Sequence, residues 1–243
     1  MVLQTPIIER VAKLKQLFDE GHIPKLHQHE VHPDLPMNDR IRYIYFTLPV
    51  SLNFQRSSPA MWQSALATYD DPETNYLFYP EKVVITKREK LQQDLRKHSL
   101  SLQVNRHTDI WYALSKTLHD YYNDDPREVI KKGQSCVVRI KNLLQITEKK
   151  NFPYLSGAKM SNYWLYILLQ YTDVNLRNQH KISIIPDTHV LQCSLELGIS
   201  LENDTPDIVA EKWFKILKGN DITPAQMHPV LWNWSRNKFL PEV

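Results

Sequence analysis

Apolar residues recur at three- and four-residue spacing in nearly every long segment of this chain. Such spacing places them on one face of a helix. Four of the five glycines follow or punctuate segments of this kind, as helix C-terminal caps do: Gly21, Gly133, Gly198 and Gly219. The clearest apolar run comprises Met160, Tyr163, Trp164, Ile167, Leu168 and Tyr171. The pattern predicts an all-α protein.

The same spacing predicts where helices and irregular segments lie. The apolar and aromatic stretch 41–69 favours helix over a strand followed by a helix. The turn-like segment 70–84 is expected to form a short extended piece just before residues 83–85. We expect Thr108 or Asp109 to cap a helix at its start. Helices are predicted over residues 6–19, 108–122, 127–147, 160–171, 188–197, 207–217 and 224–237.

Composition narrows the class of protein. Hydrophobic residues make up 42% of the chain and charged residues 23%, which is ordinary for a globular protein and argues against disorder. No run of about eighteen apolar residues occurs, and the amphipathic N-terminus is no signal peptide. We therefore expect no membrane segment and an intracellular location, in the cytoplasm and nucleoid or in a nucleus. The formal charge of +3 permits nucleic-acid binding without arguing for it.

Metal-binding patterns are weak. Cys136 and Cys193 have neither zinc-site spacing nor the count of a disulfide framework. The Pro-rich loop after Gly21 contains four histidines, His22, His27, His29 and His32, but neither cysteine nor patterned carboxylate completes a zinc site there. We expect no metal.

Two short motifs carry the strongest functional signal. In the first, Leu155-Ser156-Gly157-Ala158-Lys159, Ser156 is the expected N-cap, which puts Lys159 in the first turn of an apolar helix. The positive end of the helix dipole disfavours a cation there, and an amine nucleophile must be neutral. In the second, Pro186-Asp187-Thr188-His189-Val190, Asp187 can cap a helix and present an oxygen. Either residue alone would suggest an ordinary surface lysine or a structural cap.

With both motifs in this order, the sequence resembles the helix-hairpin-helix superfamily of DNA glycosylases, with an endonuclease-III-like core. The resemblance covers Leu52 to the chain end and is strongest over 151–198. It implies that Lys159 attacks the sugar, expels the base and forms a Schiff base, while Asp187 stabilises sugar cation character. Tyr154 or Leu155 stands where the family has glycine. The 28-residue step from Lys159 to Asp187 is similar to the archaeal 8-oxoguanine DNA glycosylase branch.

The resemblance also implies binding residues. Residues around the hairpin and the second motif should contact DNA: Leu155, Gly157, Ala158 and His189. The segment 51–57 resembles the stretch that fills the gap left by an extruded base, with Gln55 as the plug and Arg56 on phosphate. A helix end with a solvated Gln-Arg pair explains Gln55 and Arg56 equally well. Candidates for the base pocket are Asn53, Phe54, His228 and Trp232.

The implied architecture is two helical lobes with a DNA-binding cleft between them. Residues 1–105 and 200–243 would form one lobe, and 106–199 a helical barrel carrying the hairpin. The chain ends at Val243 without the four cysteines of several relatives, so no iron–sulfur cluster is expected. A monovalent cation at the hairpin stays open. The predicted partner is damaged double-stranded DNA, bound by a monomer. Alternatives are an N-glycosidase acting on a modified nucleoside or nucleotide and a non-catalytic nucleic-acid-binding module.

Overall fold

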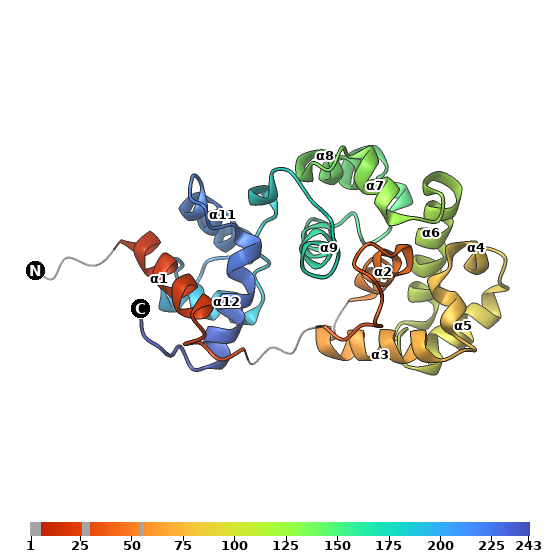
Figure 1. Cartoon of the computed structure of the whole chain (residues 1–243), viewed down its shortest axis with the longest axis horizontal. Coiled ribbons are helices and arrows are strands. Elements are labelled where there is room, and N and C mark those ends of the chain that lie inside the picture. Colours follow the sequence, from red (N-terminus) through yellow and green to blue (C-terminus); the bar gives the residue numbers. More distant parts are fainter. Residues whose placement is uncertain (1–5, 26–29, 54–55) are drawn as a thin grey trace, which may run out of the picture. The chain divides into compact units, whose positions relative to one another are not determined.

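The computed structural model describes residues 6–25, 30–53 and 56–243, and these ranges are helical (Figure 1). Within them no β-strand occurs, and a single isolated bridge joins Cys136 to Arg177. The all-α prediction is therefore confirmed. The chain divides into two compact units: unit 1 spans residues 1–29 and 179–243, and unit 2 spans residues 30–178.

Unit 1 is a helical cluster around α12 (Pro224–Arg236), which contacts α1 (Ile7–Asp19), α10 (Thr188–Glu196) and α11 (Pro206–Leu217). The short 3-10 helix η5 (Gln179–Lys181) also touches α12. A capping box between Thr223 and Gln226 starts α12 and satisfies amides that its first turn would leave open. The core of unit 1 includes Val11, Leu14, Val190, Leu197, Val209, Trp213, Met227, Leu231 and Trp234.

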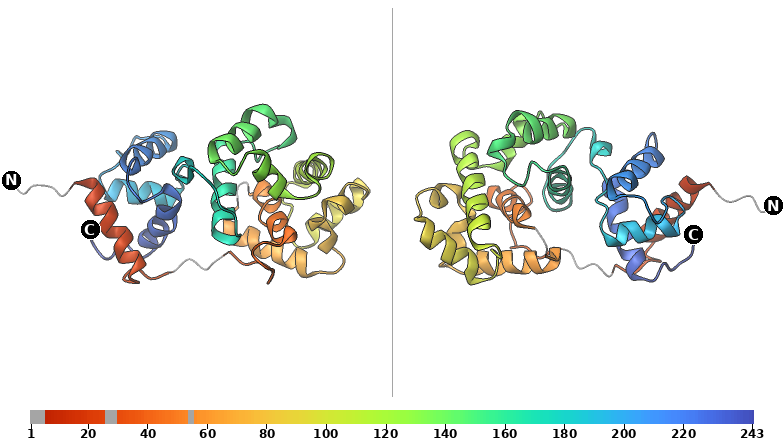
Figure 2. Two further views of the ribbon diagram at one scale, coloured as in Figure 1. Left: turned by 45° about the horizontal axis from the view of Figure 1, so that its top comes forward. Right: turned by 180° about the vertical axis from the view of Figure 1, so that it is seen from behind.

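The helices of unit 2 surround an aromatic core of Tyr45, Phe46, Trp62, Phe78, Trp111 and Trp164. Figure 2 shows its helices from two further sides. In chain order they are α2 (Arg40–Tyr45), η1 (Pro49–Leu52), α3 (Ser58–Asp70), η2 (Asn75–Phe78), α4 (Pro80–Val83), α5 (Arg88–Lys97), α6 (Val104–Tyr122), α7 (Pro126–Lys132), α8 (Val137–Asn142), the π-helix η3 (Leu143–Thr147), η4 (Lys149–Asn151) and α9 (Ala158–Tyr171).

Most predicted helices are confirmed, but several are shorter than the sequence pattern. The stretch 41–69 is helical, yet it divides into α2, η1 and α3, with Pro49 beginning η1. Residues 127–147 likewise divide into α7, α8 and η3, interrupted near Gly133. Gly21, Gly198 and Gly219 end helices in the left-handed region, with φ of 81°, 68° and 82°. Apolar periodicity thus located the helices and missed their breaks.

Two expectations about local structure are wrong. No extended piece precedes residues 83–85, because Pro80 starts the short helix α4. Thr108 does not cap α6, which begins at Val104; its hydroxyl instead donates to the Val104 carbonyl at 2.6 Å. The division into units runs differently from the expected lobes, because residues 30–178 form one unit and α10 belongs to the other.

Candidate active site

The turn before α9 is built around two buried side chains. Phe152 retains 2% of its surface and Leu155 none, so both anchor the turn in unit 2. The Thr117 hydroxyl of α6 also donates to the Asn151 carbonyl at 2.7 Å. The chain leaves this anchored turn directly into α9, where Lys159 is the second residue and is exposed. A fixed turn therefore presents the predicted nucleophile to solvent.

Tyr154 occupies the position where the resembled family has glycine. Its φ is 67°, in the left-handed region that glycine adopts without strain. The ring of Tyr154 lies 5.1 Å from the Arg106 guanidinium, in a cation–π contact that joins the turn to α6. Of the two residues considered from sequence, Tyr154 is thus the one with the glycine conformation.

The predicted N-cap is wrong by one residue. Gly157, not Ser156, flanks α9, with φ −63° and ψ 144° and no side-chain cap hydrogen bond. Ser156 instead belongs to the turn, where its amide donates to the Phe152 carbonyl at 2.9 Å. The amides of Leu155 and Gly157 are bonded within the turn as well. A phosphate could therefore meet the amides of the first turn of α9, which lack intrahelical acceptors, rather than the whole predicted segment 155–159.

Neighbouring helices hold the first turn of α9 in place. Gln145, inside the π-helix η3, donates to the Ser161 hydroxyl at 2.7 Å. Lys141 of α8 donates to the Asn162 side chain at 3.1 Å, and Asn162 donates back to the Ala158 carbonyl at 2.7 Å. Gly157 and Ala158, predicted to bind DNA, are exposed beside these contacts. Leu155, also predicted, offers no exposed side chain.

In unit 1, Asp187 caps α10. Its Oδ1 accepts the Val190 amide at 2.9 Å, which confirms the predicted cap. The side chain is half-buried, and its Oδ2 takes no part in this cap hydrogen bond. Asp187 therefore belongs to unit 1, whereas Lys159 belongs to unit 2.

His189 follows the cap and joins a polar and aromatic array on α10 and α12. Its Nδ1 lies 3.1 Å from the Ser235 hydroxyl, which donates to Gln192 Oε1 at 3.0 Å. Because Ser235 uses its hydrogen on Gln192, His189 Nδ1 carries a hydrogen, which leaves Nε2 for other partners. The His189 ring contacts Trp232 at 4.8 Å, and the Arg236 guanidinium lies 4.4 Å from the Trp232 ring.

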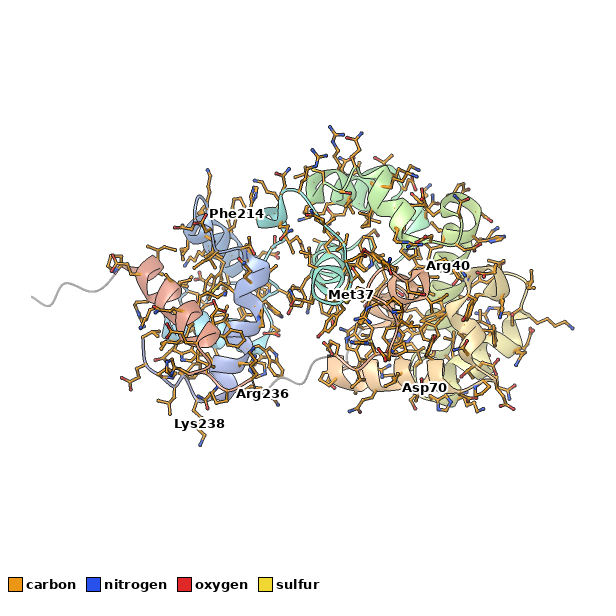
Figure 3. All side chains as sticks on the ribbon, viewed as in Figure 1. Met37, Arg40, Asp70, Phe214, Arg236 and Lys238 are labelled. Carbon is orange, nitrogen blue, oxygen red and sulfur yellow. The ribbon has the colours of Figure 1, made fainter. Side chains whose placement is uncertain are left out.

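Figure 3 labels Arg236 on α12. The array thus brings together His189 and Trp232, which were predicted from the sequence, and Arg236, which was not. It has the aromatic and cationic character that suits contact with nucleic acid. His228, another candidate for the base pocket, is half-buried on the same helix.

The segment before α3 shows a mixed outcome. Arg56 donates to the carbonyls of Ser99, Leu100 and Ala60 and to the Ser64 hydroxyl, each at 3.0 to 3.1 Å. Its guanidinium therefore ties unit 2 together, and we no longer expect it to contact phosphate. Asn53 is half-buried, and its Oδ1 has no hydrogen-bond partner among the described residues. Phe54 and Gln55 lie outside the described residues.

Sequence reasoning missed one buried acid, Glu30. The side chain retains 6% of its surface and accepts a hydrogen bond from Ser58 at 2.9 Å. Burial raises the pKa of Glu30 to about 7, against smaller lowering effects of hydrogen bonds from Ser58, Trp62 and Tyr163. A single glutamate in a Pro- and His-rich loop shows no helical spacing, so no sequence signal marked it.

Other sites on the described residues are unpromising. A depression of about 550 Å³ in unit 2 contains none of the predicted site residues and is lined by Glu73, Lys87, Glu89, Lys90, Gln93 and Asp94. No group of three histidine, cysteine or acidic side chains that could hold a metal occurs in the described ranges, which exclude His27 and His29. Across the same ranges, no helix is both long enough and apolar enough to span a bilayer.

Comparison with known proteins assigns no family. No model of a known protein family matches the chain, and no curated protein matches it significantly. The helix-hairpin-helix resemblance therefore rests on the residues quoted above.

Proposed function

We propose that the chain is a base-excision DNA glycosylase with abasic-site lyase activity, of the helix-hairpin-helix type. One observation carries the proposal: a turn anchored by buried Phe152 and Leu155 leads into a helix whose first turn presents an exposed Lys159. A lysine is unfavourable at that end of a helix for stability alone. Its presence beside open backbone amides suits a residue that meets a phosphodiester chain.

The chemistry assigned to Lys159 is nucleophilic. Its neutral amine attacks the anomeric carbon of the damaged nucleotide, and the bond to the base breaks with its electron pair leaving on the base. Loss of an amine proton and opening of the sugar ring at the C1′–O4′ bond then give the Schiff base, with the ring oxygen taking up a proton. The Schiff base acidifies the neighbouring sugar carbon, so loss of a proton there expels the 3′-phosphate and cuts the strand. Asp187 supplies the negative charge that stabilises cationic sugar character. This reaction requires no redox cofactor.

The substrate is proposed to be duplex DNA with an oxidised base such as 8-oxoguanine, bound by a monomer with two lobes and a DNA-binding cleft. Extrusion of the base is required because the anomeric carbon is inaccessible within the stack. His189 and Trp232 in unit 1 and Asn53 in unit 2 are candidates for contacting the extruded nucleotide. Gly157 and Ala158 are candidates for the phosphate.

Borohydride trapping tests the proposal. The purified protein is mixed with duplexes that carry 8-oxoguanine, an oxidised pyrimidine, uracil or an abasic site, and the Schiff base is reduced to a stable adduct. We expect an adduct with the abasic duplex and with at least one lesion. Lys159→Gln should abolish it.

Lys150→Gln is the matched control, because it removes one positive charge beside the same turn without touching the nucleophile. It should weaken DNA binding and leave adduct formation intact at saturating protein. If the folded protein forms no adduct with any duplex, the lyase proposal fails. Release of a base from a free nucleoside would then favour the N-glycosidase alternative, and DNA binding without any product the non-catalytic module.

A further inference from the structure

A chain of hydrogen bonds connects buried Glu30 to α9. The Ser58 hydroxyl donates to Glu30 Oε1 at 2.9 Å and lies 2.6 Å from the Tyr163 hydroxyl. Trp62 Nε1 donates to the same Tyr163 hydroxyl at 3.2 Å. We refer to Glu30, Ser58 and Tyr163 as the Glu30 relay. All of its members lie in unit 2.

The relay ends one helical turn from the proposed nucleophile. Tyr163 follows Lys159 by four positions on α9, so the two side chains share one face of that helix. Tyr163 is almost completely buried and retains 9% of its surface, whereas Lys159 is exposed. The 3-10 helix η1, which Asn53 directly follows, also packs against α9. The buried Asn53 Oδ1 is a hydrogen-bond acceptor with no partner in the described ranges.

The protonation state of Glu30 determines which groups of the Glu30 relay donate and which accept hydrogen bonds. An ionised carboxylate only accepts, so it draws the hydrogen of Ser58 toward itself, and that of Tyr163 either directly or through the Ser58 hydroxyl. A protonated carboxyl can donate to Ser58, which then donates to the Tyr163 oxygen. Trp62 donates to that oxygen in both states. Only when Glu30 is protonated is the Tyr163 hydroxyl hydrogen released from the relay and available to a ligand.

Four tyrosine phenols that interact with Glu30 keep their own protons near neutral pH. Tyr163, Tyr166 and Tyr171 on α9 and Tyr45 on α2 interact electrostatically with it. Burial raises the pKa of all four phenols above the ordinary tyrosine value. The Tyr171 hydroxyl accepts the Glu30 amide at 2.9 Å, and the His32 ring packs against Tyr171 at 5.8 Å.

We propose that Tyr163 is a base-recognition residue and that Glu30 positions its hydroxyl hydrogen. The ligand is an extruded nucleobase that presents an acceptor, a carbonyl oxygen or an unprotonated ring nitrogen, to the Tyr163 hydroxyl. The inference rests on the proposed function and adds to it a residue that contacts the base. It makes base excision, but not reaction at an abasic site, dependent on the protonation state of the relay.

Single-turnover excision from about pH 5.5 to about pH 8.5 tests this, on the 8-oxoguanine duplex or whichever duplex of the trapping panel reacts best. For the wild type we expect the excision rate to fall about tenfold as pH rises through about 7, since one donor is lost. Glu30→Gln carries an amide donor at every pH, so its excision rate should not fall in this pH range. Tyr163→Phe should be about tenfold slower at low pH.

Two controls separate the possible failures. All variants should form the wild-type amount of adduct with a preformed abasic site, where no base is recognised. Tyr76→Phe removes a comparable hydroxyl–carboxylate hydrogen bond, to Asp94 at 2.7 Å, and should leave excision unchanged. Absence of any abasic adduct from folded wild type would remove the proposed function and this inference together.

A normal abasic adduct with an unchanged pH profile in Glu30→Gln would overturn the inference alone. So would a Tyr163→Phe defect of equal size on abasic and base-containing duplexes. Infrared difference spectra of wild type against Glu30→Gln follow the carboxyl without DNA. We expect a protonated carboxyl band that titrates near pH 7, and its absence at about pH 6 would also refute the relay.

Discussion

The two units use their charged groups differently. In unit 1, charges stabilise the fold: Asp187 caps α10, and the Arg10 guanidinium donates to the carbonyls of Leu197 and Val243. In unit 2, two charges lie where folding does not favour them. Lys159 occupies the first turn of α9, where no side chain caps the helix, and Glu30 is buried among aromatic rings.

This difference separates charged residues that stabilise the fold from charged residues whose placement stability does not explain. A charged side chain at a helix end normally has the sign opposite to that end of the helix dipole. Buried carboxylates normally have charged partners. Lys159 departs from the first rule and Glu30 from the second. Unit 1 contains the reverse case, Asp187, which serves the fold and is also proposed to serve the reaction.

The largest effect is expected when the two roles of Asp187 are separated. Asp187→Asn keeps an oxygen that can accept the Val190 amide but removes the negative charge. Excision should fall by about a hundredfold to a thousandfold, with the thermal midpoint nearly unchanged. Asp187→Ala should in addition lose about 1 kcal/mol of stability. Single-turnover kinetics and thermal melts measure both, and full activity in Asp187→Asn would leave Asp187 only as a cap.

A second large effect concerns the stability of unit 2 against pH. The pKa of Glu30 rises from an ordinary 4.5 to about 7 on folding, so the folded chain binds the proton more tightly. Stability should therefore be highest below about pH 4.5 for this group and fall as pH rises to about 7, by about 3 kcal/mol in total. Glu30→Gln should lose this dependence in urea titrations. A stability that rises over the same interval in wild type only would contradict the buried protonated carboxyl.

Much of the fold could be predicted because helices repeat a local pattern. The stripes of α9, α11 and α12 were visible as apolar spacing, and Asp187 as a cap was visible from its position before a helix. What failed depends on contacts between distant residues. Nothing near Arg56 in the sequence indicates that carbonyls some forty residues later would bind its guanidinium.

The same limit applies to the candidate site. Its Lys159 and Asp187 were found by motif, whereas Glu30 was missed because its partners, Ser58 and Tyr163, lie 28 and about 130 residues away. The N-cap of α9 was misplaced by one residue because Ser156 has the better capping side chain, while the turn fixes its amide on Phe152.

A smaller effect is expected at Tyr154, where the turn holds a bulky residue at positive φ. Tyr154→Ala keeps the left-handed strain and loses the Arg106 contact, so it should destabilise unit 2 by about 1 kcal/mol. Tyr154→Gly loses the same contact but relieves the strain, and should lie within about 0.5 kcal/mol of wild type. Urea titration of both variants measures the difference, and equal destabilisation would show that φ at this position carries no cost.

The smallest effect is expected at Ala158, where a substitution should change helix stability and DNA affinity in opposite directions. Ala158 is exposed beside Lys159, and Ala158→Glu places an acid at the positive end of the helix dipole. Unit 2 should gain about 0.5 kcal/mol, since the charge matches the dipole. The same carboxylate should repel phosphate, so affinity for duplex DNA should fall about fivefold at low salt, with the loss shrinking as salt increases. Ala158→Gln, of similar size without charge, should change neither quantity. A gain in stability with unchanged DNA affinity would mean that phosphate does not approach this helix end, and that the uncapped start of α9 serves something other than DNA.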